Sequence, residues 1–174
     1  TKAISIKPDY VDAYNNMGNT LQDQGKLDEA IEVYEKALLI QPDYAEAHYN
    51  MGNALKDLDK LEEAVGAYTK AISLKPDYIL AHNNMGNALK DQGKLEEAIE
   101  AYTKAISLKP DYPEAYYNMG IALKDQGKLG EAIEAYTKAI SMKPNYAEAY
   151  YNMGNALKDL GDLDDAIEAY TKAI

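Results

Sequence analysis

Apolar residues recur along the chain at helical spacing, in paired stretches separated by short polar breaks. Within residues 45–78, the first stretch has apolar or small residues at offsets of three, four and seven: His48, Met51, Gly52 and Leu55. The second stretch continues the period with Leu61, Ala64, Val65, Tyr68, Ala71, Ile72 and Leu74. Such spacing is typical of amphipathic helices. The pattern therefore predicts two helices, with a break at Leu58-Asp59-Lys60 and an end before Pro76, because proline disfavours helix at the preceding residue.

This pair of stretches returns every 34 residues along the whole chain. The prolines that mark the period are Pro8, Pro42, Pro76, Pro110 and Pro144, and the glycines are Gly18, Gly52, Gly86, Gly120 and Gly154. A constant offset indicates one helix-turn-helix unit that is copied and stacked into a solenoid. We expect function on a long repeated surface rather than in one buried cleft, which favours a binding scaffold over an enzyme.

Three local expectations follow from the repeat. The break residues, Gly25, Asp59, Gly93, Gly127 and Gly161, should adopt positive φ, which glycine does freely. Capping boxes should open the first helices, because an Asp or Asn precedes a Glu by three residues in Asp43/Glu46, Asp111/Glu114 and Asn145/Glu148. Gly52 should face Ala64 and Ala71, so that the two helices of a pair approach closely.

The repeated residues resemble those of the tetratricopeptide repeat. The matching series is His48, Met51-Gly52, Leu55, Ala64, Tyr68, Ala71 and Pro76. The resemblance implies an all-α, right-handed superhelical solenoid that forms one array over residues 1–174. Its full repeats are 11–44, 45–78, 79–112 and 113–146; residues 147–174 are a truncated fifth repeat, and 1–10 are the end of a preceding one.

The asparagine-rich run from Asn15 to Leu38 most resembles the repeats that precede the catalytic domains of O-linked N-acetylglucosamine transferase and SPINDLY-type proteins, and related prokaryotic arrays. No catalytic domain is present in these residues, so the resemblance implies only the recognition part. The chain is therefore expected not to be an enzyme itself. The alternative is that it is the substrate-recruiting arm of a larger transferase.

The family resemblance places the first helix of each repeat on a concave groove. Two columns of asparagines would then line it: Asn16, Asn50, Asn84, Asn118 and Asn152, and beside them Asn19, Asn53, Asn87 and Asn155, with Ile121 in the fourth repeat. A third column contributes Tyr49, Tyr117 and Tyr151, and a fourth contributes Lys56, Lys90 and Lys124. An amide donates and accepts at once, so a ladder of amides could hold an extended peptide by its backbone. We predict a peptide or protein segment as partner. Three alternatives stay open for the ladder: simple inheritance between copied repeats, a solvated polar face, or hydrogen bonds between repeats.

The composition argues against several other functions. The chain has 174 residues, a net charge of −11 and no cysteine. The negative charge argues against nucleic acid and anionic membrane surfaces, since both require basic patches. His48 and His82 are expected to be packed core residues rather than metal ligands, so we expect no metal, cofactor or catalytic residue. The compartment is not fixed, although we favour the cytoplasm. Ile167 and Ile174 should be partly bare at the end of the array, which would give weak head-to-tail self-association.

Overall fold

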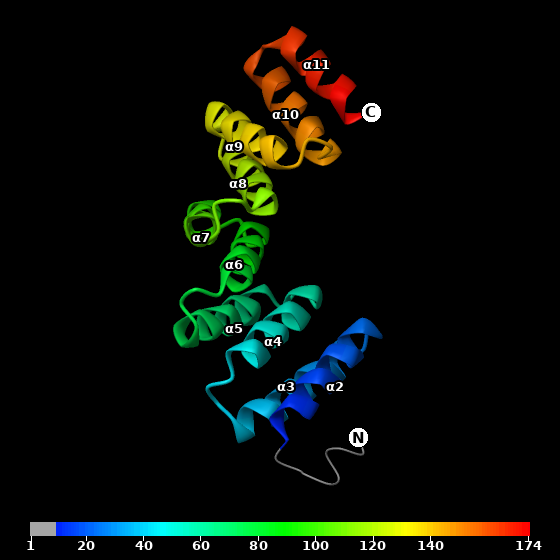
Figure 1. Cartoon of the computed structure of the whole chain (residues 1–174), viewed down its shortest axis with the longest axis vertical. Coiled ribbons are helices and arrows are strands. Elements are labelled where there is room, and N and C mark those ends of the chain that lie inside the picture. Colours follow the sequence, from blue (N-terminus) through cyan, green and yellow to red (C-terminus); the bar gives the residue numbers. More distant parts are fainter. Residues whose placement is uncertain (1–9) are drawn as a thin grey trace. The chain divides into compact units, whose positions relative to one another are not determined.

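The computed structural model describes residues 10–174, and this part of the chain consists of α-helices and the turns between them (Figure 1). The helices are α2 (Val11–Asp23), α3 (Leu27–Ile40), α4 (Ala45–Asp57), α5 (Leu61–Leu74), α6 (Ile79–Asp91), α7 (Leu95–Leu108), α8 (Pro113–Asp125), α9 (Leu129–Met142), α10 (Ala147–Leu160) and α11 (Leu163–Ala173). The helix pair predicted within residues 45–78 is present as α4 and α5, and the all-α class is confirmed.

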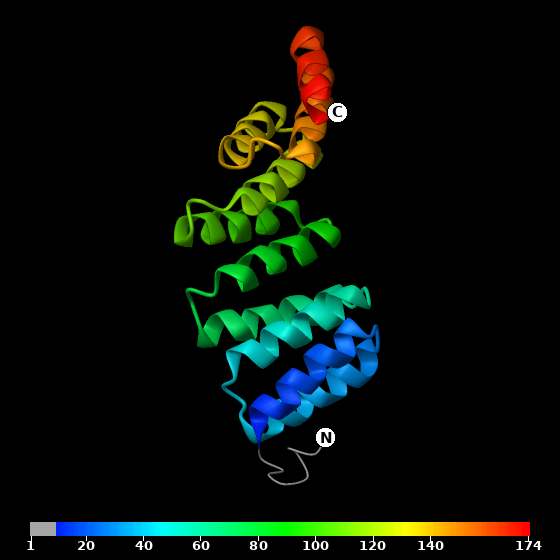
Figure 2. The same ribbon diagram turned by 45° about the vertical axis from the view of Figure 1, so that its right-hand side comes forward.

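The chain divides into two compact units, which are described separately. Unit 1 extends to Gln92 and contains α2 to α6, whereas unit 2 begins at Gly93 and contains α7 to α11. Within the units, successive helices pair as hairpins, namely α2 with α3, α4 with α5, α8 with α9, and α10 with α11 (Figure 2).

The two helices of a hairpin have different neighbours. In unit 1, the backbone of α4 lies close to those of α2 and α6, and in unit 2, the backbone of α10 lies close to that of α8. In the described residues, no Cα atoms of α3 and α5, or of α9 and α11, lie within 8 Å of each other. The first helices of the hairpins thus lie against one another within each unit. We call the surface that α2, α4 and α6 form in unit 1, and α8 and α10 form in unit 2, the first-helix face.

The hairpin turns have the backbone that the sequence predicts. Asp59 has φ 60°, and the equivalent glycines have φ between 74° and 100°: Gly25, Gly93, Gly127 and Gly161. Glycine reaches this left-handed region without a steric penalty, and aspartate is one of the few other residues that tolerate it. The turn therefore explains why glycine recurs here in register.

The predicted capping boxes do not form. Each first helix begins one residue later than the boxes require, so the N-cap residue is a tyrosine, as at Tyr44, and its side chain makes no capping hydrogen bond. Glu46 instead forms an ion pair with Lys75 (Oε1 to Nζ, 3.3 Å), and the Tyr44 hydroxyl donates to Asp12 Oδ1 at 3.0 Å. The acidic residue of the proposed box thus binds another helix end rather than its own backbone.

A tyrosine of the second helix packs inside each hairpin, and it is buried in all of them except the last, where Tyr170 is half-buried. Tyr34, Tyr68 and Tyr136 are fully buried, and burial raises the pKa of their hydroxyls. The closest neighbour of Gly52 is Tyr68 rather than the expected Ala64 or Ala71, because the three atoms nearest to an added Cβ at Gly52 all belong to the Tyr68 ring, the first at 2.7 Å. Glycine is required in the first helix because the aromatic ring lies against its backbone.

Two glycine substitutions test this contact. Gly52→Ala should lower the free energy of unfolding by about 1–3 kcal/mol, because the new methyl group must displace the buried ring. Gly66→Ala in α5 is the matched control, since an added Cβ there meets no atom within 4 Å. It should raise the free energy by about 0.5–1 kcal/mol through helix propensity alone. Urea denaturation measures both, and equal effects would contradict the ring contact.

Candidate peptide-binding surface

The residues predicted to bind a peptide all lie on first helices. They are Asn16 and Asn19 on α2; Tyr49, Asn50, Asn53 and Lys56 on α4; Asn84, Asn87 and Lys90 on α6; Tyr117, Asn118 and Lys124 on α8; and Tyr151, Asn152 and Asn155 on α10. Most are half-buried, whereas Asn16 and Tyr151 are exposed. The helical period therefore places them as the sequence predicts, with part of each side chain accessible.

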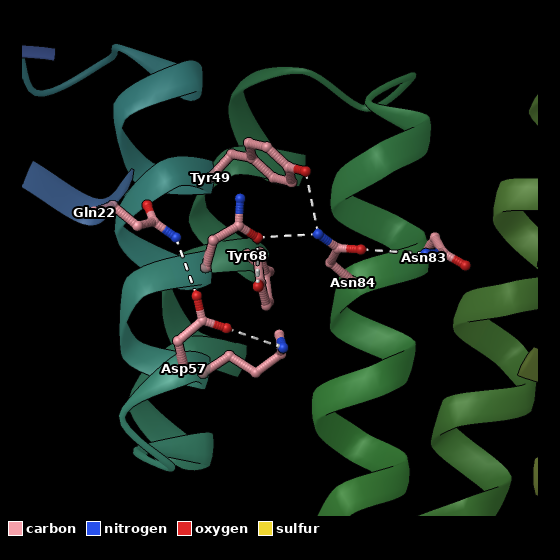
Figure 3. A network of polar contacts seen from close by, with 8 residues as sticks. Gln22, Tyr49, Asp57, Tyr68, Asn83 and Asn84 are labelled. Carbon is pink, nitrogen blue, oxygen red and sulfur yellow. Dashed lines mark hydrogen bonds and ion pairs between the residues drawn. The ribbon is translucent and has the colours of Figure 1, made fainter. Parts of the chain in front are cut away.

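In unit 1, three of these positions and a buried tyrosine join into one hydrogen-bonded group (Figure 3). Asn84 Nδ2 donates to the Tyr49 hydroxyl at 3.1 Å and to Asn53 Oδ1 at 2.9 Å. The Tyr68 hydroxyl donates to the same Asn53 oxygen at 2.8 Å. We call Tyr49, Asn53, Tyr68 and Asn84 the polar quartet. It joins α4 and α5 to α6, the first helix of the next repeat.

The same bonds recur in other repeats. Between α2 and α4, Asn50 Nδ2 donates to Asn15 Oδ1 at 3.0 Å, and the Tyr34 hydroxyl donates to Asn19 Oδ1 at 2.7 Å. In unit 2, the Tyr170 hydroxyl donates to Asn155 Oδ1 at 2.9 Å. These asparagines therefore make hydrogen bonds within and between repeats, which is one of the alternatives that the sequence left open.

Sequence reasoning missed the tyrosine hydroxyl as the partner of the second asparagine column. A signal for it existed, because Asn19 and Tyr34, Asn53 and Tyr68, and Asn155 and Tyr170 are each 15 residues apart. Tyrosine also stands in this chain where phenylalanine would fill the same volume, and the chain contains no phenylalanine. A buried hydroxyl requires an acceptor, and the asparagine oxygen supplies it.

The fourth repeat breaks the pattern at Ile121. Asn152 Nδ2 still donates to the Tyr117 hydroxyl at 2.9 Å. The Tyr136 hydroxyl, however, is buried and has no hydrogen-bond partner in the described part of the chain, because isoleucine replaces the asparagine that would accept from it. An unsatisfied buried hydroxyl costs about 1–3 kcal/mol.

The predicted lysine column is paired with carboxylates. Lys56, Lys90 and Lys124 each contact the aspartate that follows in the sequence, at 3.3, 2.8 and 3.5 Å, respectively. Gln22 Nε2 also donates to Asp57 Oδ2 at 3.2 Å, as Figure 3 shows. Surface ion pairs of this kind contribute little to stability. This edge of the first-helix face therefore carries both signs of charge rather than the positive stripe that lysines alone suggest.

Tyrosines line the opposite edge of the face. Tyr49 packs on Tyr78, and Tyr117 packs on Tyr146, both with ring centroids 4.9 Å apart. Burial raises the pKa of Tyr78 and Tyr146 to about 12, and nearby carboxylates and a second tyrosine add to the shift. Tyr151 is 56% exposed. It borders an open pocket of about 560 Å³ whose lining includes Tyr117, Asn152 and Tyr170.

The two histidines have structural contacts. His48 and His82 each place Nε2 3.0 Å from a proline carbonyl, that of Pro42 and Pro76, respectively. Each imidazole N–H can thus satisfy a carbonyl beyond the end of the preceding helix. Among residues 10–174, no group of three or more His, Cys, Asp or Glu side chains is arranged to hold a metal ion. None of the helices in this part of the chain is long and apolar enough to cross a membrane.

Comparisons with known proteins agree on the repeat. A sequence profile described as "TPR repeat" matches residues 18–59, 52–93, 86–127 and 122–161. Two profiles described as "Tetratricopeptide repeat" match residues 1–32 and 149–174. No curated protein matches the chain.

Solved structures resemble most of the chain. A crystal structure of MamA has 31% identity and a TM-score of 0.87 and covers 94% of this chain and 89% of its own. YrrB, described as a TPR protein with an unusual peptide-binding site, has 27% identity and a TM-score of 0.83 over 100% of this chain and 90% of its own. PilF of Pseudomonas aeruginosa has 24% identity and a TM-score of 0.84, and the match covers 94% of this chain and 74% of PilF. At this identity, the likeness supports the fold alone. These comparisons support the helical-repeat fold and leave the transferase likeness untested.

Two tyrosine substitutions test the hydrogen-bonded groups. Tyr68→Phe should lower the free energy of unfolding by about 0.5–1.5 kcal/mol, because it removes the bond to Asn53. Tyr136→Phe is the matched change in unit 2. It should leave the free energy of unfolding unchanged or higher, because it removes a hydroxyl that has no acceptor. Urea denaturation of both variants measures the difference. Equal losses would show that Tyr136 is as well satisfied as Tyr68.

Proposed function

Because the chain belongs to the tetratricopeptide-repeat family, we propose that it is a protein-interaction scaffold that holds an extended peptide on its first-helix face. The observation that carries this proposal is the recurrence of half-buried asparagines on that face. Their helix propensity is poor, so each one costs helix stability that alanine would not.

Some of the asparagines retain hydrogen-bonding groups after their contacts within the protein, whereas Asn84 donates both amide hydrogens and also accepts from Asn83 Nδ2 at 3.1 Å. Asn50 uses one amide hydrogen on Asn15 Oδ1, and an amide has a second hydrogen and an oxygen with two lone pairs. The contacts also hold each amide in one orientation, which reduces the entropy lost on binding. A fixed donor and acceptor match the N–H and C=O of a peptide bond whatever the peptide's side chains are.

The tyrosines and the charges of the face support a peptide ligand in two further ways. Tyr151 is exposed beside an open pocket, and tyrosine is enriched where proteins bind partners. Carboxylates and lysines alternate at the face, as in Glu46 with Lys75 and Lys56 with Asp57. YrrB, which covers this whole chain, is described as having a peptide-binding site. A peptide with mixed charge fits these features better than a nucleic acid does.

The recruiting arm of a larger transferase is the alternative within the same recognition class. It rests on the likeness of the asparagine-rich repeats to those that precede sugar-transferase domains. Sequence beyond Ile174 in the parent protein would decide between the two, since a catalytic domain there makes the peptide a substrate.

Removal of two amides tests the proposal. The probe is a peptide selected by the native chain from a random peptide library. Asn50→Ala with Asn53→Ala should weaken its binding by about 0.5–1.5 kcal/mol for each amide, as measured by calorimetry. The double variant also loses contacts to Asn15, Tyr68 and Asn84, so a urea titration must first show that it is folded at the assay temperature.

Tyr68→Phe is the control for that stability loss. It removes a hydrogen bond to Asn53 from behind the face, and its fully buried side chain cannot touch a ligand. We expect it to bind the peptide as the native chain does. An unchanged affinity of the double asparagine variant would exclude the amides from binding.

Self-association is a second candidate, favoured by the exposed apolar side chains of α11. Ile167 is 64% exposed and Leu163 is 59% exposed. In the preceding repeat, the equivalent Ile133 packs against Leu157 and Ala166 of α10 and α11. The expectation that Ile167 and Ile174 are bare is thus confirmed, whereas the opposite end, residues 1–7, lies outside the described residues.

Sedimentation velocity tests self-association. The native chain should sediment faster as its concentration rises, because a second copy can cover the exposed apolar face of α11. Ile167→Gln should abolish the rise without loss of fold, since this side chain is mostly exposed. Glu134→Gln, an exposed change on α9, serves as the control and should keep the native behaviour. A native chain that stays monomeric at every concentration would contradict the candidate.

A further inference from the structure

Ile121 is a natural substitution in the polar quartet. The quartet of unit 1 is Tyr49, Asn53, Tyr68 and Asn84, and the equivalent residues of unit 2 are Tyr117, Ile121, Tyr136 and Asn152. Three of the four residues are identical in kind, so the two groups differ at one position. Asparagine holds that position in the other four repeats, as Asn19, Asn53, Asn87 and Asn155.

The substitution removes two acceptor contacts. In unit 1, Asn53 Oδ1 accepts from the Tyr68 hydroxyl at 2.8 Å and from Asn84 Nδ2 at 2.9 Å. In unit 2, the Tyr136 hydroxyl is buried without a partner in the described residues, and the hydrogen bond of Asn152 Nδ2 goes to Tyr117. A folded protein that keeps an unsatisfied buried hydroxyl commonly does so where function requires the residue that causes it.

Ile121 places an apolar group on α8 where the other repeats have an amide. Ile121 packs against the core cluster that contains Tyr136 and Ala156, and it is only half-buried. Tyr117 lies four residues earlier on α8 and so shares its helix face. Tyr117 and Asn152 also line the open pocket of about 560 Å³, together with Tyr151 and Tyr170. At the position of Ile121, the first-helix face of unit 2 is therefore apolar where that of unit 1 presents the amide of Asn53.

We infer that Ile121 is a specificity-determining residue, which selects an extended segment that has an apolar side chain opposite α8. The inference rests on the proposed function and deepens it. At the equivalent position of unit 1, Asn53 offers its amide N–H groups, because its oxygen already accepts from Tyr68 and Asn84. An N–H group favours a polar side chain or a carbonyl of the peptide backbone. The ligand class is thus a peptide that unit 2 holds through its backbone and by one apolar residue opposite α8.

The test couples a change in the protein to a change in the peptide. Peptides selected from a random library by the native full chain are first scanned to find an apolar residue whose replacement by Ser weakens binding. Ile121→Asn should lower the affinity for the original peptide by about tenfold or more, which is the value of one buried apolar side chain. The Ser peptide should bind Ile121→Asn and the native chain about equally, so the two changes are not additive.

A stability measurement with one added substitution, and a control variant, complete the test. Ile121→Asn should also raise the urea midpoint, because it gives the Tyr136 hydroxyl its acceptor, and adding Tyr136→Phe should cancel that gain. Glu134→Gln, an exposed change on the second helix α9, should leave both peptides unaffected.

The outcomes separate the two proposals. A native chain that selects no peptide overturns the proposed function and the inference together. A native chain that selects peptides, while Ile121→Asn binds them with equal affinity or loses the same amount for both peptides, overturns the inference alone. Non-additive losses with a folded, stabilised Ile121→Asn support both.

Discussion

The contact between a first-helix glycine and a second-helix tyrosine is the constraint on which each hairpin depends. At Gly52, an added Cβ would lie 2.7 Å from the Tyr68 ring, and Gly18, Gly120 and Gly154 meet their own tyrosines in the same way. The ring lies against the glycine, and its hydroxyl reaches Asn53 Oδ1 on the first helix, at 2.8 Å. The tyrosine therefore does two things that phenylalanine could not: it fills the hairpin, and it presents a donor beneath the asparagines.

This arrangement links stability and recognition through the same amides. Asn53 accepts from the buried hydroxyl of its own repeat and from Asn84 of the next, so it joins neighbouring repeats as well as facing the ligand side. Stability in such arrays is a sum over nearest-neighbour interfaces, and these bonds belong to that sum. A change at an asparagine thus alters binding and folding together, which is why Tyr68→Phe is needed to separate them.

The fold could be predicted from the sequence because its causes are local. The period of apolar residues fixes the helices, and the positive φ at Gly25 and Asp59 requires the residues found there. The helix starts could not be placed to one residue, since the Asp43 box and the Tyr44 N-cap differ only in where the turn after Pro42 ends. The partners of the asparagines were missed for a different reason: residues 15 apart meet only when a hairpin closes, and residues 31 or 35 apart only after the hairpins stack. Sequence period shows that such positions recur together, but not which atoms they bring into contact.

Near-identical repeats make the departures more informative than the shared residues. An asparagine that is present in every copy is explained equally well by inheritance, by packing or by binding. Ile121 is different, because its neighbours Tyr117, Tyr136 and Asn152 are unchanged in kind, and the cost falls on a hydroxyl that the other repeats satisfy. Random loss of the asparagine would remove that acceptor without placing an apolar group on the face beside an open pocket. The repeat array thus provides its own internal control, in which the quartet of unit 1 is the reference for the quartet of unit 2.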